Sequence, residues 1–260
     1  KSNKTATENL RRCLPKKDKW EYDMILKGMW ENLGRNAAEL PHLRQIAHER
    51  VEFEGLDVFK QLATDNLPAI FISGHFANWE AGSAAIVLNK GMPLSVVFRQ
   101  PNNPWVAMMM EDIRGLDGQQ QMIQKSRIGT KQMMAAMQEG RHVGMLIDQK
   151  YNEGIAVPFM GHPAMTSPAF ANLCQRFECP LVPIELERTY GANFKLTFHP
   201  PMKLFDDNGK PLPIKTVIED AHHYLENWIT ERPAQWLWLH RRWNSKALEK
   251  TSEDDNSQAL

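Results

Sequence analysis

Cysteine is scarce in this chain, and its few thiols form no recognisable metal or redox pattern. Cys13, Cys174 and Cys179 make an odd number, and no two of them have the Cys-x-x-Cys spacing. Reduced thiols in a cytoplasmic compartment therefore fit better than a disulfide framework. The HExxH motif and paired Cys/His zinc spacings are also absent, so no metal is expected.

Motifs of several common enzyme classes are missing as well. There is no GxSxG sequence, which disfavours a hydrolase with an activated serine. No two glycines stand two positions apart, which excludes GxGxxG, and the GKS or GKT of a phosphate-binding loop is absent. The formal net charge is zero, so the composition gives no indication of nucleic-acid binding.

A long apolar run is the third absence. The longest stretch without Asp, Glu, Lys or Arg extends from Gly154 to Gln175, and Pro158, Pro163 and Pro168 interrupt it. Such a stretch cannot form a membrane-spanning helix. We interpret it as a loop followed by a helix.

Charge is unevenly distributed along the chain. Residues 1–19 contain seven basic side chains against Glu8 and Asp18, which suits either a basic membrane-proximal segment or a frayed terminus. Residues 249–260 are polar, acidic and free of glycine, as expected for a disordered tail. Residues 20–248 are then left for one folded domain, which is long enough to bury a substantial core.

Apolar runs and helical patterns alternate along this domain. Short apolar runs predict buried strands at 69–72, 94–98 and 143–147, and an alternating pattern predicts a half-exposed strand at 194–198. Pro183 marks the strand at 181–186 as an edge or irregular strand. Strands that alternate with helices indicate an α/β fold with a mostly parallel central sheet flanked by helices. Helices are predicted from Tyr22 towards Pro41, around 56–62, at 80–90, 104–114, 130–139 and 168–178, and from Thr216 onward.

Ligands of such sheets bind beyond the carboxyl ends of the strands, which draws attention to the residues after Ile72. Gly74 allows a sharp turn there, and His75 is followed five positions later by Glu80 in the next helix. That carboxylate can return to the imidazole and fix its tautomer, although it can equally complement a helix dipole. His75 can also be an ordinary turn residue. Because no protein nucleophile is evident, a base that deprotonates a substrate hydroxyl for attack on an activated acyl carbonyl fits best.

Three further segments contain side chains that can contact a substrate. Arg99 follows the second predicted strand, where its guanidinium can hold a phosphate or simply face solvent. Asp148 and Gln149 follow the third strand, where an acid can order a loop, bind a sugar or cap the strand. Residues 235–243 interleave three tryptophans with a histidine and two arginines, a pattern typical of an interfacial edge or of core packing.

These segments together resemble a known family. The chain is similar to bacterial lipid A biosynthesis acyltransferases of the lauroyl/myristoyl type, within the lysophospholipid-acyltransferase-like superfamily that a His-x4-Asp/Glu motif defines. The resemblance extends from about Thr7 to Lys246. It includes ATENLRRCLP at 6–15, GMWENLGRNAAELPHL at 28–43, SGHFANWE at 73–80, VVFRQPNNP at 96–104, IDQ at 147–149, VPFMGHPAMTSPAFANLC at 157–174 and PAQWLWLHRRW at 233–243.

The resemblance implies a fold and a set of residue roles. The fold is expected to be glycerol-phosphate-acyltransferase-like, with His75 and Glu80 as the catalytic dyad. The residues expected to bind substrate are Arg99, Asp148, Gln149, Asn78, Arg188 and Arg241.

The resemblance also implies partners and a location. Members of the family take an acyl chain from acyl carrier protein, sometimes from coenzyme A, and esterify a 3-hydroxyacyl chain on a Kdo-bearing lipid A precursor. They need no cofactor beyond the thioester co-substrate, and they work at the cytoplasmic face of the inner membrane. Members usually begin with one transmembrane helix, so we expect an anchor to have been removed upstream of Lys1.

Other functions remain open at this point. The acceptor can be another membrane lipid of the superfamily, such as a phospholipid, an ornithine lipid or a mannoside. An acyl hydrolase or thioesterase would use His75 to activate water instead. A non-catalytic lipid-binding domain would not depend on His75 and Glu80 at all.

Overall fold

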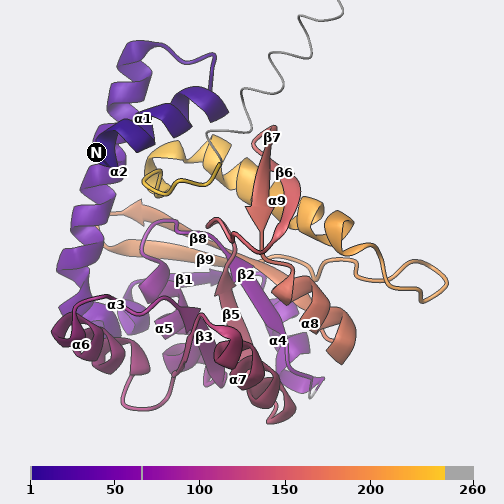
Figure 1. The fold of residues 1–260 in the computed structure, drawn as a ribbon. Coiled ribbons are helices and arrows are strands. Elements are labelled where there is room, and N and C mark those ends of the chain that lie inside the picture. Colours follow the sequence, from indigo (N-terminus) through magenta and orange to yellow (C-terminus); the bar gives the residue numbers. More distant parts are fainter. Residues whose placement is uncertain (1, 66, 244–260) are drawn as a thin grey trace, which may run out of the picture.

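A seven-stranded sheet forms the centre of the protein (Figure 1). The structure is a computed structural model and describes residues 2–65 and 67–243, so the tail predicted at 249–260 lies outside the described residues. The strands are β1 (Val51–Glu54), β2 (Ile70–Ser73), β3 (Leu94–Phe98), β4 (Gln121–Gln124), β5 (His142–Leu146), β6 (Ile155–Phe159), β7 (His162–Thr166), β8 (Leu181–Tyr190) and β9 (Asn193–Phe198). The sheet has the order β1-β9-β8-β2-β5-β3-β4, and each neighbouring pair is parallel except β8 with β9. The predicted α/β fold with a mostly parallel sheet flanked by helices is confirmed.

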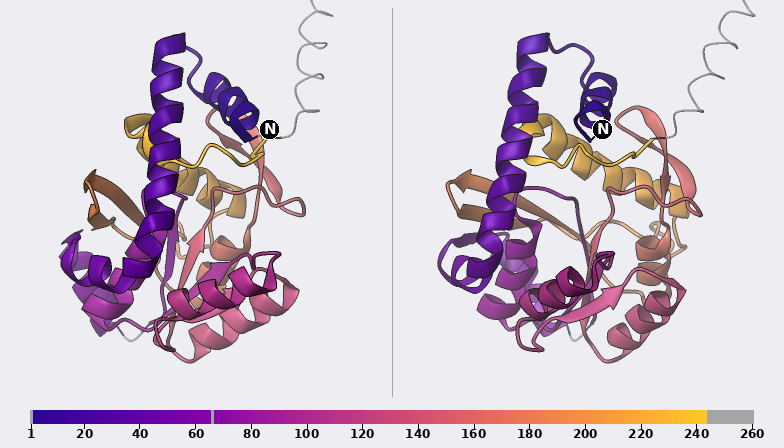
Figure 2. Two further views of the ribbon diagram at one scale, coloured as in Figure 1. Left: turned by 90° about the vertical axis from the view of Figure 1, so that its left-hand side faces the viewer. Right: turned by 60° about the vertical axis from the view of Figure 1, so that its left-hand side comes forward.

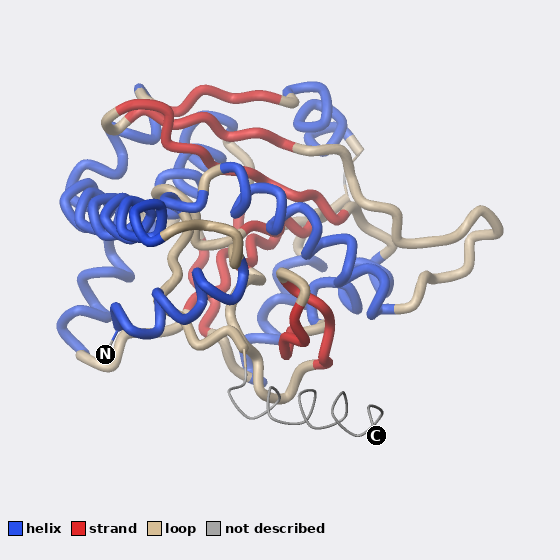
Figure 3. The backbone as a smooth tube through the Cα atoms, turned by 90° about the horizontal axis from the view of Figure 1, so that it is seen from above, coloured by secondary structure: helices blue, strands red, loops and turns tan. Residues whose placement is uncertain are grey.

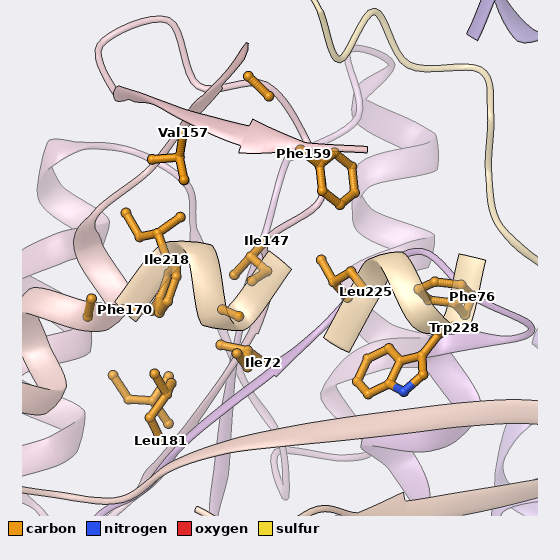
Figure 4. Close-up of a cluster of buried hydrophobic side chains, with 14 of the residues drawn as sticks. Ile72, Phe76, Ile147, Val157, Phe159, Phe170, Leu181, Ile218, Leu225 and Trp228 are labelled. Atoms are coloured by element: carbon orange, nitrogen blue, oxygen red, sulfur yellow. The ribbon is translucent and has the colours of Figure 1, made fainter. Parts of the chain in front are cut away.

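The sheet separates two hydrophobic cores. The helices are α1 (Ser2–Cys13), α2 (Lys19–Glu39), α3 (Leu43–Glu49), α4 (Leu56–Thr64), α5 (Trp79–Lys90), α6 (Pro104–Gly115), α7 (Arg127–Gln138), α8 (Ala169–Phe177) and α9 (Ile214–Glu231), with 3-10 turns η1 (Leu40–His42) and η2 (Pro233–Gln235). In β2, Ile70 and Ile72 belong to the core with α1, α2, α7, α8 and α9, whereas Phe71 belongs to the core with α3, α4 and α5. A strand covered on both faces is apolar throughout, as the sequence indicated. Figure 4 shows Ile218 and Leu225 of α9 in the first core, close to Ile72.

The two N-terminal helices pack against one side of the sheet domain (Figure 2). Helix α2 begins with a capping box, in which Asp18 and Glu21 each accept a hydrogen bond from the other's backbone N–H. Helix α1 lies within the predicted basic segment, and its Ala6 and Leu10 are fully buried in the first core. Residues 2–13 of this segment therefore form a helix that apolar contacts fix to the domain.

Strand β8 lies inside the sheet, so the edge position predicted from Pro183 is wrong. The strand pairs with β2 as far as Pro183 and with β9 from Ile184 onward. Proline lacks the backbone N–H that a ladder needs, but here it occupies the residue at which the strand passes from one ladder to the other. Its carbonyl still accepts a hydrogen bond from the backbone of His199 at 3.0 Å.

The stretch from Gly154 to Gln175 contains a hairpin, β6–β7, where we predicted only a loop before the helix. Figure 3 shows this hairpin apart from the main sheet. Its turn residues Met160 and Gly161 both have positive φ, of 52° and 75°, which is the turn that matches the twist of a hairpin. Methionine is an unusual residue for the first of these positions, so no sequence pattern predicted this turn. Within the described residues, no helix here or elsewhere is both long and apolar enough to span a membrane.

Candidate active site

His75 lies in the short loop that joins β2 to α5, at the carboxyl end of the strand. Its side chain is 14% exposed. The preceding Gly74 permits a close approach, because a Cβ at that position would lie 2.8 Å from the Phe76 ring and 3.2 Å from Oδ2 of Asp148. A larger residue would therefore displace the carboxylate that contacts His75.

Asp148, just after β5, holds the imidazole. His75 Nδ1 lies 2.7 Å from Asp148 Oδ1, and the His75 backbone N–H donates to Oδ2 at 2.8 Å. The indole N–H of Trp236 also donates to Oδ2 at 2.8 Å. Burial by itself raises the pKa of this carboxyl, but the adjacent His75 ring and these hydrogen bonds outweigh burial and hold the pKa below its ordinary value. Asp148 is thus an ionised acceptor, so Nδ1 of His75 carries a proton and Nε2 is the basic nitrogen.

Glu80, in the first turn of α5, contacts partners other than the predicted one. Its carboxylate accepts hydrogen bonds from Arg114 at 3.0 and 2.5 Å and from the Trp79 indole at 2.8 Å. The Trp79 ring meets the His75 ring edge to face, with centroids 5.0 Å apart. Both ring nitrogens of His75 have other neighbours. The structure therefore pairs the imidazole with Asp148, and Glu80 holds Arg114 and the Trp79 ring that faces the imidazole.

Gln149 follows Asp148 and reaches the opposite side of the imidazole. Its side-chain nitrogen lies 3.1 Å from His75 Nε2 and 3.0 Å from Nε2 of a second histidine, His240. The two histidine rings are 5.3 Å apart. Gln149 is therefore the predicted substrate-binding residue that the structure brings closest to the basic nitrogen.

A cavity of about 710 Å³ has His75 and Gln149 in its wall. Its apolar wall includes Val96, Phe98, Met122, Met133, Met145 and Phe170. Its cationic wall includes Arg99, Arg114, Lys125 and Lys150. A cavity with both kinds of wall can take a hydrocarbon chain together with a phosphate or another anionic group.

The remaining predicted substrate-binding residues lie outside this cavity. Asn78 is fully buried, where it caps α5 and donates to Glu39 of α2. All five N–H groups of Arg188 donate within the protein, to side chains of α2 and to one backbone carbonyl. Both residues therefore join α2 to the domain, and all the N–H groups of Arg188 are used there. Arg241 is exposed and is not among the cavity residues.

Two residues that complete the site come from the C-terminal segment, whose role the sequence left open. Trp236 forms an isolated antiparallel β-bridge with Phe76 in the His75 loop. The next residue, Leu237, donates its N–H to the His75 carbonyl at 3.1 Å. This pairing brings the Trp236 indole to Asp148 and the His240 ring to Gln149. The interleaved tryptophans were the available signal, but the pattern alone could not distinguish these contacts from core packing.

The geometry defines a class of protein. A carboxylate-held imidazole at the carboxyl edge of a parallel sheet, next to a partly apolar cavity, suits proton removal from a hydroxyl beside a bound chain. A profile of the family described as "Bacterial lipid A biosynthesis acyltransferase" matches residues 1–245. The chain therefore belongs to this family of acyl-transferring enzymes.

Known relatives are similar over most of their length. The lipid A biosynthesis myristoyltransferase of Escherichia coli (strain K12) is 23% identical, over 92% of this chain and 74% of the relative. Lipid A biosynthesis acyltransferase 2 of Shigella flexneri is 22% identical, over 92% of this chain and 76% of the relative. The lipid A biosynthesis palmitoleoyltransferase of Escherichia coli (strain K12) is 22% identical, over 95% and 80%.

Proposed function

We propose that this protein transfers a fatty acyl chain from a thioester, carried by acyl carrier protein or coenzyme A, to a hydroxyl of a lipid A precursor. The single observation that carries the proposal is the 2.7 Å contact between His75 Nδ1 and buried Asp148, since it leaves Nε2 as a base in the cavity wall. The names of the relatives, all lipid A acyltransferases, support the acceptor.

In this mechanism His75 Nε2 takes the proton of the acceptor hydroxyl as the oxygen attacks the thioester carbonyl. Asp148 fixes the tautomer and stabilises the imidazolium, a role that the sequence had suggested for Glu80. Glu80 acts instead through Trp79 and Arg114. The apolar wall of the cavity takes the acyl chain, and its cationic wall, with Arg99, takes the anionic part of the lipid or of the donor.

We further propose that the reaction takes place at the cytoplasmic face of the inner membrane. The turn between α1 and α2 supports this location, because Lys16, Lys19 and Trp20 are exposed there, Trp20 to 69%. Basic and aromatic side chains together suit a surface of anionic lipid headgroups.

The substitution His75→Asn tests the proposed base. Asparagine places an amide nitrogen near the position of Nδ1, so it can keep the hydrogen bond to buried Asp148 while it removes Nε2. We expect the rate of acyl transfer to fall roughly 10²- to 10⁴-fold, with little change in the melting temperature. Purified protein is incubated with lipid A precursor and each type of acyl thioester, and the products are measured by mass spectrometry.

The matched control is His223→Asn, at an exposed position of α9, which should transfer acyl chains at the wild-type rate. Normal transfer by the His75→Asn variant would refute the assignment of the base. Acyl release by the wild-type protein at the same rate with and without lipid acceptor would show a thioesterase instead. Transfer to a phospholipid or ornithine lipid in preference to lipid A precursor would correct the acceptor.

A further inference from the structure

Gln149 contacts the basic nitrogen, and its contacts constrain the protonation of two histidines. A carboxamide nitrogen carries two hydrogens and has no free lone pair to accept with. Its contacts of 3.1 Å to His75 Nε2 and 3.0 Å to His240 Nε2 therefore require both ring nitrogens to accept. For His75 this agrees with the proton on Nδ1, which faces the ionised Asp148.

His240 is held in place as a neutral acceptor. Burial lowers the pKa of its imidazole, and the neighbouring His75 ring, Arg99 and Lys125 lower it further against the opposing effect of Asp148. The His240 carbonyl accepts a hydrogen bond from the side chain of Asn9, a buried residue of α1, at 2.8 Å. The hydrogen bond from Asn9 thus holds the backbone of His240 in place. Because its pKa is lowered, the His240 ring is neutral at neutral pH, and Nε2 carries no proton.

Transfer of an acyl group also needs donors for the negative charge that develops on the carbonyl oxygen. Three backbone amides of the His75 loop are already used: that of His75 donates to Asp148, that of Phe76 to the Gly74 carbonyl at 2.8 Å, and that of Ala77 to the Gln235 carbonyl at 3.0 Å. The Arg114 guanidinium is held by Glu80. Among the described residues, the Gln149 carboxamide is a donor in direct contact with the base, at 3.1 Å from His75 Nε2.

We propose that the Gln149 carboxamide donates to the carbonyl oxygen of the thioester in the transition state, and that His240 positions it for this task. This inference rests on the proposed function. His75 Nε2 has one lone pair, so an acceptor hydroxyl that binds there must displace the Gln149 N–H. Since Gln149 contacts His75 Nε2 at 3.1 Å, the displaced N–H stays beside the hydroxyl that binds there and can turn to the carbonyl oxygen, while the other N–H stays on His240.

The chemical step balances with these groups. The hydroxyl oxygen forms a bond to the carbonyl carbon, its proton passes to His75 Nε2, and the carbonyl π electrons move onto the oxygen that Gln149 then stabilises. Collapse of the tetrahedral intermediate breaks the C–S bond, and His75 returns its proton to the departing thiolate. The products are the ester and the thiol. Gln149 is thus a catalytic residue, and His240 is a positioning residue.

The substitution Gln149→Met tests the donor, because methionine keeps the shape of the side chain and removes both N–H groups. We expect kcat to fall roughly 100- to 1000-fold, as for loss of one donor to an oxyanion, while KM for both substrates stays close to the wild-type value. Gln138→Met, at an exposed position of α7, is the matched control and should leave kcat unchanged. Melting temperatures show whether each variant folds.

Two His240 variants test the positioning role. His240→Phe removes the acceptor and keeps a flat ring, so we expect a fall in kcat of roughly 10- to 100-fold from misplacement of Gln149. His240→Gln supplies a carbonyl oxygen in place of Nε2 and should recover much of that loss, which a merely structural role of the ring would not predict. His223→Phe, on the surface of α9, controls for the substitution itself.

A dithioester donor, in which sulfur replaces the carbonyl oxygen, gives a readout at the reacting atom. Sulfur accepts hydrogen bonds weakly. Replacing the thioester by the dithioester should therefore lower the rate of the wild-type protein much more than it lowers the rate of the Gln149→Met variant. Wild-type kcat in Gln149→Met, or equal slowing of both proteins by the dithioester, would overturn the inference while His75→Asn still tests the base separately. If Gln149→Met does not fold, equal kcat values of His240→Phe and His240→Gln overturn it. Absence of any transfer by the wild-type protein would refute the proposed function as well.

Discussion

One buried carboxylate organises the site at the scale of single residues. Asp148 accepts hydrogen bonds from the ring and the backbone of His75 and from the Trp236 indole. Because a buried charge without partners is costly, these three donors and the carboxylate hold one another in place. Glu80, five positions after His75, satisfies a separate pair of donors on Arg114 and Trp79.

A double-mutant cycle separates these two groups. Glu80→Gln and Arg114→Gln each remove the same ion pair, so we expect similar losses of kcat from each and no larger loss from the two together. The combination of Glu80→Gln with Asp148→Asn should be worse than either alone, since these changes act on different contacts. Initial rates of acyl transfer are measured for the wild-type protein and for these five variants. Strictly additive losses of Glu80→Gln and Arg114→Gln would contradict the pairing.

At the scale of elements, local patterns predicted the parts of the fold whose burial follows a simple period. The strands at 69–72 and 94–98 lie where the apolar runs predicted, as does the half-exposed strand at 194–198, and Gly91 ends helix α5 with φ of 63°. The place of β8 in the sheet was predicted wrongly. The effect of a proline depends on whether a neighbouring strand would accept a hydrogen bond from the backbone N–H at that position. β1 and β4 were not predicted, since each is a four-residue edge strand whose exposed side chains break the apolar run.

The contact of α9 with the β6–β7 hairpin depends on a neutral histidine. His222 is fully buried, donates from Nδ1 to the Pro158 carbonyl at 2.6 Å, and faces Thr166 and Arg242 with Nε2. Burial is the main cause that lowers its pKa from 6.5 to about 4, with Arg242 and His223 adding to the effect and Pro158 opposing it. Between these values the unfolded chain binds a proton that the folded chain does not. The free energy of unfolding should therefore fall by about 3 kcal/mol from this group as the pH drops from 6.5 to 4.

His222→Gln tests this prediction, because glutamine keeps a donor and an acceptor but does not titrate in this range. Denaturant unfolding at several pH values between 6.5 and 4 should show a shallower loss of stability than in the wild-type protein. The exposed neighbour offers the control, since His223→Gln should leave the slope as it is. Equal slopes for all three proteins would mean that His222 takes up its proton in the folded state as readily as in the unfolded state.

At the scale of the whole molecule, the sequence predicted the place of the site better than its connections. The carboxyl ends of β2, β3 and β5 do meet at one cavity, as a parallel sheet requires. Short spacing suggested Glu80 as the partner of His75, but the imidazole contacts Asp148, which is 73 positions away in the chain. Contacts of that kind depend on the register between strands and on the docking of the C-terminal segment, neither of which has a local pattern.

The proposed membrane location predicts salt-dependent binding of the whole protein to anionic vesicles. Replacing Lys16 and Lys19 by glutamine should weaken binding roughly 30-fold, at about 1 kcal/mol for each basic residue near the surface. Sedimentation with vesicles that contain anionic lipid, at low and at high salt, measures the effect. The exposed pair Lys203 and Lys210 provides the control, and an equal loss from its substitution by glutamine would contradict membrane contact through Lys16 and Lys19.

The hydrogen bond from Trp236 to Asp148 ties activity to the completeness of the chain. During synthesis the strands and His75 emerge first, and the carboxylate then lacks its third donor until the last part of the domain has left the ribosome. Before this segment docks, His75 would therefore lie in an incomplete site and would hydrolyse thioesters only slowly. One indole N–H therefore makes completion of the site depend on docking of the segment that contains Trp236.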